Sequence, residues 1–118
     1  MNWNVKIQTY LIPLWLLIFV SSIFSQHPDW IIYDMSNSGL PDDRILSLAI
    51  DANGNKWIGT AFSGLAVFDG ANWTIYNTSN SGFPNNLIRS IWIDGDGNRW
   101  IATHGGGLAV YNQGALFL

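Results

Sequence analysis

Four side chains in this sequence are suited to binding a polar ligand, namely Arg44, Arg89, Trp92 and His104. A guanidinium group can hydrogen-bond the oxygen atoms of a ligand, and an indole can stack on the face of a sugar ring. At the mouth of a channel, such residues would form a binding site. The alternative is that Trp92 packs in a core and the arginines are solvated strand ends, and the usual placement of arginine favours this alternative.

Catalytic and metal chemistry have less support. His104 lies in a Gly-rich turn, and no serine, cysteine or carboxylate is spaced to form a nucleophilic or acid-base set with it. Residues 94–98, DGDGN, begin like a calcium-binding loop, but Arg99 stands where that loop requires glycine and Gly105 where it requires glutamate. We therefore predict a protein that is not an enzyme and that needs no metal or other cofactor.

These residues belong to a segment that occurs twice. Residues 30–72 align without gaps on residues 73–115, a period of 43 residues, and a period of this size is typical of solenoids, propellers and other repeat arrays. Residues common to both copies are predicted to form a hairpin and a packing surface rather than to carry chemistry. The shared set is Asp51, Gly54, Asn55, Trp57, Thr60, Asp94, Gly97, Asn98, Trp100 and Thr103.

Each copy contains four short apolar segments separated by turn residues. In the first they are residues 30–33, 45–50, 56–60 and 65–69, and in the second residues 73–76, 88–93, 99–103 and 108–111. Four antiparallel strands per period of this length, with a repeated tryptophan, indicate a β-propeller blade. We predict an all-β fold of about two blades, each a four-stranded meander, with inner strands 45–50 and 88–93 covered on both faces. Because residues 30–33 and 73–76 would be outer strands, the one complete blade is residues 45–76.

The amino-terminal region differs from the repeats. An apolar run at residues 11–20 and small residues ahead of Gln26 predict a signal peptide over residues 1–25 and a partial propeller over residues 26–118. The chain is therefore expected to be periplasmic or secreted, with no membrane span beyond the signal peptide. Its formal charge of −3 gives no basis for nucleic-acid binding.

The sequence closely resembles the two-component regulator propeller repeat. The resemblance rests on residues 40–70, LPDDRILSLAIDANGNKWIGTAFSGLAVFDG, and their echo at residues 83–114, and it extends over residues 30–114. It implies a ligand-binding, non-enzymatic propeller of the kind found in the periplasmic sensor regions of hybrid two-component systems. The ligands it implies are oligosaccharides or other small molecules.

Two blades are fewer than the four to eight that typically close a propeller, so we expect a fragment of a longer protein. Its open faces would be covered by further blades of the same protein or by self-association. The resulting hypothesis is a propeller segment of a two-component-type sensor. The alternative is a segment of a secreted multi-repeat protein that binds or scaffolds at the cell surface.

Overall fold

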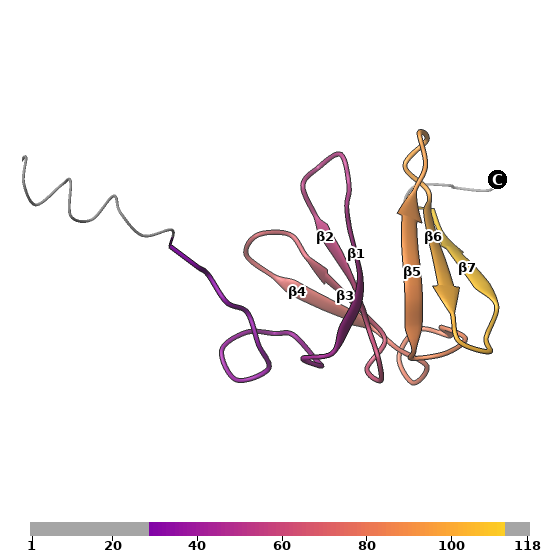
Figure 1. Ribbon diagram of the computed structural model, residues 1–118. Helices are drawn as coiled ribbons and strands as arrows, with labels where there is room; N and C mark the ends of the chain where they lie inside the picture. Colours follow the sequence, from indigo (N-terminus) through magenta and orange to yellow (C-terminus); the bar gives the residue numbers. More distant parts are fainter. Residues whose placement is uncertain (1–28, 113–118) are drawn as a thin grey trace, which may run out of the picture. The chain divides into compact units, whose positions relative to one another are not determined.

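A computed structural model describes residues 29–112, which form two antiparallel β-sheets (Figure 1). The first sheet has the order β1-β2-β3-β4 and the second the order β5-β6-β7, so each is a simple meander. The strands are β1 (Ile45–Ile50), β2 (Lys56–Thr60), β3 (Leu65–Phe68), β4 (Trp73–Tyr76), β5 (Ile88–Ile93), β6 (Arg99–Thr103) and β7 (Leu108–Tyr111). The prediction of one complete four-stranded blade over residues 45–76 is confirmed.

The repeated Asp-to-Trp segments form hairpins, as predicted. Asp51 closes the β1–β2 turn: its backbone N–H donates to the Asn55 carbonyl over 3.0 Å, and its carboxylate accepts from the N–H groups of Asn53 and Asn55. Gly54 has a φ of 83°, a conformation that a side chain disfavours. The β5–β6 turn repeats these bonds around Asp94.

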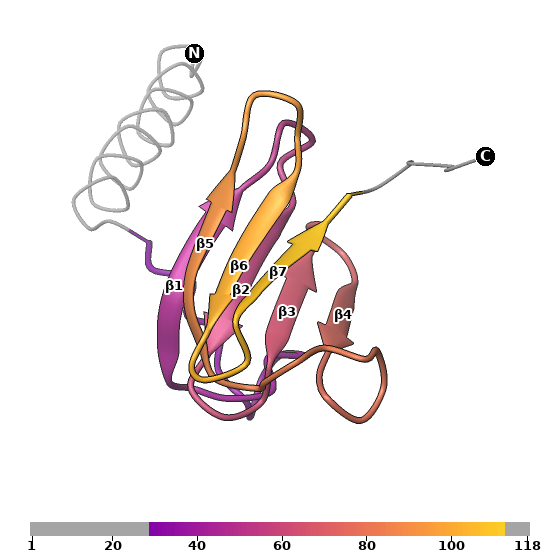
Figure 2. The same ribbon diagram turned by 90° about the vertical axis from the view of Figure 1, so that its right-hand side faces the viewer.

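The two sheets pack face to face along their inner strands. Figure 1 shows β1 beside β5, with the sheets diverging toward β4 and β7, and Figure 2 shows one sheet lying over the other. The first sheet contributes the buried Trp57 and Leu65, and the second contributes Ile88, Ile91 and Ile101. Full burial of such side chains stabilises a fold by roughly 1.5–3 kcal/mol each, so this interface is the core.

Residues 30–33, predicted to be a strand, form none. The outer strand of a blade pairs with the third strand, and in the first sheet β4 already occupies that edge of β3. Residues 30–33 therefore do not join the first sheet, although their sequence resembles that of β4. For the corresponding reason, the second copy contributes only three strands to its own sheet within the described residues.

The inner strand β1 is covered on one face rather than two. Leu48 and Ile50 are 59% and 60% exposed. Within residues 29–112, no second sheet covers the face of β1 on which they lie. The predicted signal peptide lies outside the described residues. Within the described part of the chain, no helix is long and apolar enough to cross a membrane.

Candidate functional site

The two predicted arginines lie at the same end of the two sheets, where β1 and β5 begin. Arg44 immediately precedes β1, and its guanidinium carbon lies 4.4 Å from the centre of the exposed Phe62 ring. Arg89 is the second residue of β5, and one of its terminal nitrogens lies 3.1 Å from Nδ1 of His104, the residue after β6. We call these four side chains the rim site. All are exposed.

Arg89 and His104 present polar nitrogen atoms side by side at the rim site. A guanidinium group can only donate hydrogen bonds, so Arg89 is the donor in this contact. The arginine N–H groups of the rim site can donate to a ligand, and Phe62 offers a flat apolar face. This combination suits a ligand rich in oxygen acceptors, such as a sugar or a carboxylate.

Two further side chains hold the rim site in place. Asp42 is 7% exposed and accepts from the backbone N–H groups of Arg44, at 2.9 Å, and Phe62, at 3.0 Å. Its counterpart in the second copy, Asn85, accepts from the N–H of Leu87 and donates to the carbonyl of His104 over 2.6 Å. Each therefore ties the loop before the inner strand to the loop after the second strand.

Sequence reasoning did not single out Asp42 or Asn85. They could have been recognised as equivalent positions of the repeat. They stand 43 residues apart, and each lies three residues before the inner strand of its copy. Both are side chains that readily accept from nearby backbone N–H groups.

Trp92 lies away from the rim site. It is 69% exposed and is paired in register with Trp100, which is also exposed, so both indoles lie on the face of the second sheet opposite the first sheet. The structure therefore brings Arg89 and His104 together and leaves Trp92 apart from them. Within residues 29–112, no group of three histidine, cysteine or acidic side chains is arranged to hold a metal ion.

The repeated aspartate and tryptophan form a buried latch between the sheets. In the first sheet, Asp51 Oδ2 accepts from the indole N–H of Trp57 over 2.9 Å and from Arg99 of the second sheet over 2.7 Å. The guanidinium carbon of Arg99 also lies 4.7 Å from the centre of the Trp57 ring. Burial by itself raises the pKa of Asp51, but the hydrogen bonds from Trp57, Arg99 and Asn55 outweigh it and hold this pKa well below its usual range.

Arg99 had no role in the sequence interpretation beyond excluding a calcium loop. Its counterpart in the first copy is Lys56, so a basic residue precedes the repeated tryptophan both times. In the second sheet, Asp94 Oδ2 accepts from the Trp100 indole N–H over 2.8 Å, which repeats one half of the latch. That bond, with those from Asn98 and Asp96, lowers the pKa of Asp94 to about 2.

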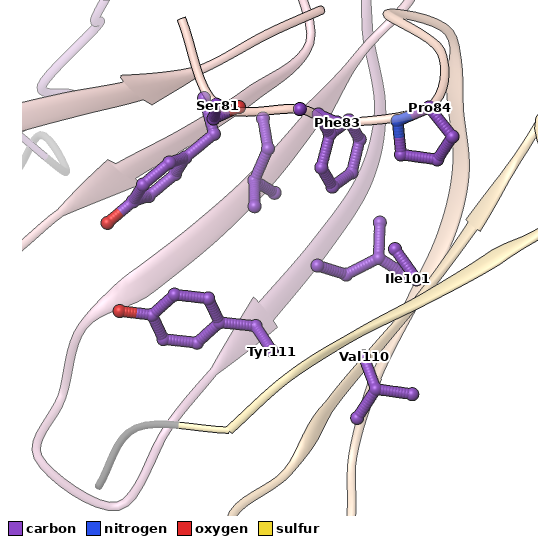
Figure 3. Close-up of a pocket in the computed structure, with 10 residues that line it drawn as sticks. Ser81, Phe83, Pro84, Ile101, Val110 and Tyr111 are labelled. Atoms are coloured by element: carbon purple, nitrogen blue, oxygen red, sulfur yellow. The ribbon is translucent and has the colours of Figure 1, made fainter. Parts of the chain in front are cut away.

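A groove opens where the sheets diverge. It has a volume of about 290 Å³, and Figure 3 shows Phe83 pointing toward Ile101, with Tyr111 beside them. A second groove of about 460 Å³ lies on the opposite face of the first sheet. The second is lined by the counterparts of these residues 43 positions earlier, Leu40, Ile58 and Phe68. Since both copies form such a groove, it belongs to the packing of the repeat rather than to recognition of one ligand.

Comparison with known proteins agrees with this geometry. The family model described as two component regulator propeller matches residues 39–62. The extracellular domain of a hybrid two component system from B. thetaiotaomicron is 30% identical, with a TM-score of 0.67, over 80% of this chain and 13% of that chain. A second such domain from that organism is 35% identical, with a TM-score of 0.48, over 58% of this chain and 10% of that chain.

No curated protein matches the sequence. The family match and the structural likeness confirm the resemblance to the two-component regulator propeller repeat. They also confirm the all-β fold of propeller type, with a four-stranded and a three-stranded sheet in the described residues. The chain spans 13% of the length of the first similar domain.

Proposed function

We propose that this chain is an extracytoplasmic, non-catalytic segment of a sensor-type β-propeller and that it contributes to ligand binding. The observation that carries the proposal is the likeness to the extracellular domain of a hybrid two component system over 80% of the chain at 30% identity. Because the chain spans a small part of that domain, we propose a contribution to a larger propeller that belongs to a longer protein.

The proposed ligand is an oligosaccharide or another small molecule rich in oxygen atoms, and it would bind at the rim site. Arg44 and Arg89 supply donors at the same end of the two sheets, and Phe62 supplies a stacking surface. In a propeller the inner strands line the central channel, so the beginnings of β1 and β5 lie at a channel mouth. The family resemblance, which implies oligosaccharide ligands for sensor members, supports the same choice.

Calorimetric titration with a panel of neutral and acidic oligosaccharides tests the ligand. We expect at least one of them to bind, and Arg89→Ala to weaken binding about tenfold, because a hydrogen bond to a charged group is lost. Thr74→Ala, on β4 at the outer edge of the first sheet, serves as the control and should bind like the unaltered chain. Absence of binding across the panel, or equal binding by the Arg89 variant, would contradict the rim site.

Two further measurements address the remaining parts of the proposal. The bound oligosaccharide should be recovered unchanged after long incubation, whereas shortened or unsaturated products would indicate an enzyme. Amino-terminal sequencing of the protein exported by a Gram-negative host should begin at Gln26, and retention of residues 1–25 would contradict cleavage. Adhesion to whole cells without binding of soluble oligosaccharides would favour the surface-scaffold alternative.

A further inference from the structure

The two halves of the rim site differ in charge. The half formed by the first copy contains Arg44, and the two residues before this arginine are carboxylates, Asp42 and Asp43. In the second copy, the positions of these two aspartates are occupied by the uncharged Asn85 and Asn86. The loop before β1 therefore offsets the charge of its arginine, whereas the loop before β5, residues 77–87, contains no carboxylate at all.

Arg89, in the second half, has no acidic partner in the part of the chain that the structure describes. Within residues 29–112, the one ion pair joins Arg99 to Asp51. The guanidinium of Arg89 instead contacts Nδ1 of His104 over 3.1 Å, and both side chains are exposed. A guanidinium that has no carboxylate partner is available for charge-assisted hydrogen bonds to the oxygen atoms of a ligand.

A backbone donor beside His104 is also without an acceptor. In the first copy, the N–H of Phe62 donates to Oδ2 of Asp42 over 3.0 Å, so a carboxylate oxygen occupies that donor. Gly105 stands at the position of Phe62 in the second copy. Within residues 29–112, however, no acceptor takes a hydrogen bond from the Gly105 N–H.

The side chain of Asn85 explains this difference between the copies. Its Oδ1 accepts from the N–H of Leu87 over 2.9 Å, which turns its Nδ2 toward the carbonyl oxygen of His104, at 2.6 Å. An amide has one acceptor oxygen, whereas the carboxylate of Asp42 has two and accepts with both. Replacement of the carboxylate by an amide therefore removes both a negative charge and the acceptor for Gly105.

No side chain of the following loop covers this half of the rim site. Residues 105–107 are all glycine, whereas the first copy has residues 62–64, FSG, at these positions. A Cβ on Gly105 would meet nothing within 4 Å, so the space around this residue is open. In the first copy the corresponding place holds the ring of Phe62, over which the Arg44 guanidinium lies.

We propose that Arg89 and the Gly105 N–H form a subsite for an oxyanion, namely the carboxylate or sulfate group of an acidic ligand. The oxyanion accepts hydrogen bonds from both donors and supplies the negative charge that Asp42 supplies in the first copy. This inference rests on the proposed ligand binding at the rim site. It specifies that the ligand is acidic and that the second copy binds its charged group, while Arg44 and Phe62 contact an uncharged part.

Nuclear magnetic resonance of the full chain during titration with sodium sulfate tests the subsite without any sugar. We expect saturable shifts of the Gly105 backbone N–H and the Arg89 guanidinium signals. Sodium chloride keeps the ionic strength constant, because general screening acts on all exposed charges. The signals of the Phe62 N–H and the Arg44 guanidinium are the internal comparison and should show no saturable shift. A parallel titration with sodium acetate compares a carboxylate with sulfate.

Asn85→Asp should block the subsite from within the chain. It gives the second copy the carboxylate that Asp42 provides in the first, so the new side chain can accept from the Gly105 N–H. The sulfate-dependent shift of Gly105 should then be lost. Asn53→Asp is the matched control, because it makes the same change in the β1–β2 turn, at the other end of the strands, where the second copy already has Asp96. This control should respond to sulfate like the unaltered chain.

Calorimetry with one sugar in an acidic and a neutral form tests the ligand class. We expect trigalacturonate to bind about tenfold more tightly than its methyl ester, because only the free acid offers a charged acceptor. Arg89→Gln keeps a donor but removes the charge, so it should abolish this preference, whereas Arg44→Gln should weaken both forms alike. A galactose trisaccharide with and without a sulfate ester shows whether the anionic group is a sulfate.

The subsite is overturned if neither sulfate nor acetate gives a saturable shift at Gly105, or if Asn85→Asp leaves that shift unchanged. Equal binding of the acidic and neutral sugars would also overturn it, although such binding would support the proposed function. A saturable response to sulfate without binding of any oligosaccharide would support the subsite and contradict the oligosaccharide as ligand. The two proposals can therefore fail separately.

Discussion

The Asp51 carboxylate receives hydrogen bonds from both sheets, and it is the residue on which the latch depends. Its side chain is 2% exposed and that of Arg99 is 8% exposed. Removing one member of a buried charge pair is costly because the other keeps its charge without a partner.

We expect Arg99→Met to lower the free energy of unfolding by about 3 kcal/mol, since it leaves Asp51 buried without its cation. Urea denaturation followed by tryptophan fluorescence measures this. Arg89→Met is the matched control, because it removes an arginine at an exposed position, and it should change stability far less. An equal loss in both variants would show that the ion pair does not stabilise the interface.

Acid should weaken the fold through the same carboxylate. The pKa of Asp51 is lower in the folded chain than in the unfolded chain, so the unfolded chain binds more protons between the two values. The stabilisation from Asp51 is therefore complete above about pH 4 and is lost as pH falls through the lower, folded pKa. Urea midpoints should be nearly equal at pH 7 and 5 and fall at pH 2.5, and Asp51→Asn should reduce that fall; an unchanged fall in the variant would contradict this assignment.

At the scale of elements, the turns decide how the strands meet. Gly64, in the turn between β2 and β3, has a φ of 83°, and a Cβ there would collide with the carbonyl oxygen of Tyr76 at the end of β4. Gly54, between β1 and β2, has the same φ, but a Cβ there would meet nothing within 4 Å. Comparing alanine substitutions at these two glycines therefore separates the cost of a left-handed backbone from the cost of a collision with β4.

We expect Gly54→Ala to destabilise the chain by about 1 kcal/mol, the cost of left-handed backbone for a residue with a side chain. Gly64→Ala should cost about 1–3 kcal/mol more, because strands β3 and β4 must also move apart. Thermal unfolding of both variants measures the difference. Equal melting temperatures would mean that the turn relaxes without disturbing β4.

At the scale of the whole molecule, equivalent residues have opposite environments. Leu65 is 1% exposed between the sheets, whereas its counterpart Leu108 is 59% exposed on the outward face of the second sheet. The difference arises from what covers each sheet and not from the side chain itself.

Leu65→Asp should prevent folding, because it buries an unpaired charge in the core, and circular dichroism would then show loss of strand structure. Leu108→Asp should leave the folded spectrum intact, because the new carboxylate stays in contact with water. If Leu108→Asp also unfolds the chain, Leu108 belongs to a core, contrary to its exposed position in the structure.

The local pattern of the sequence was sufficient to predict the strands from β1 to β7, the two Asp-to-Trp hairpins and the repeat. Alternation of short apolar segments with turn residues is a property of neighbours in the chain, and Gly54 with Asp51 defines its turn through contacts within five residues. Part of the rim site was accessible in the same way, since Arg44, Arg89 and His104 are positions at which the copies differ.

Other features depend on contacts between residues that are distant in the chain. Arg99 reaches Asp51 across 48 positions, and residues 30–33 form no strand although their sequence matches β4. The sequence by itself determined which segments favour extended structure, because that preference is local. Only the tertiary structure decided which face of each sheet is covered, that Arg99 pairs with Asp51, and which segment occupies the outer edge of β3. Each of these depends on a contact between two surfaces that are distant in the chain.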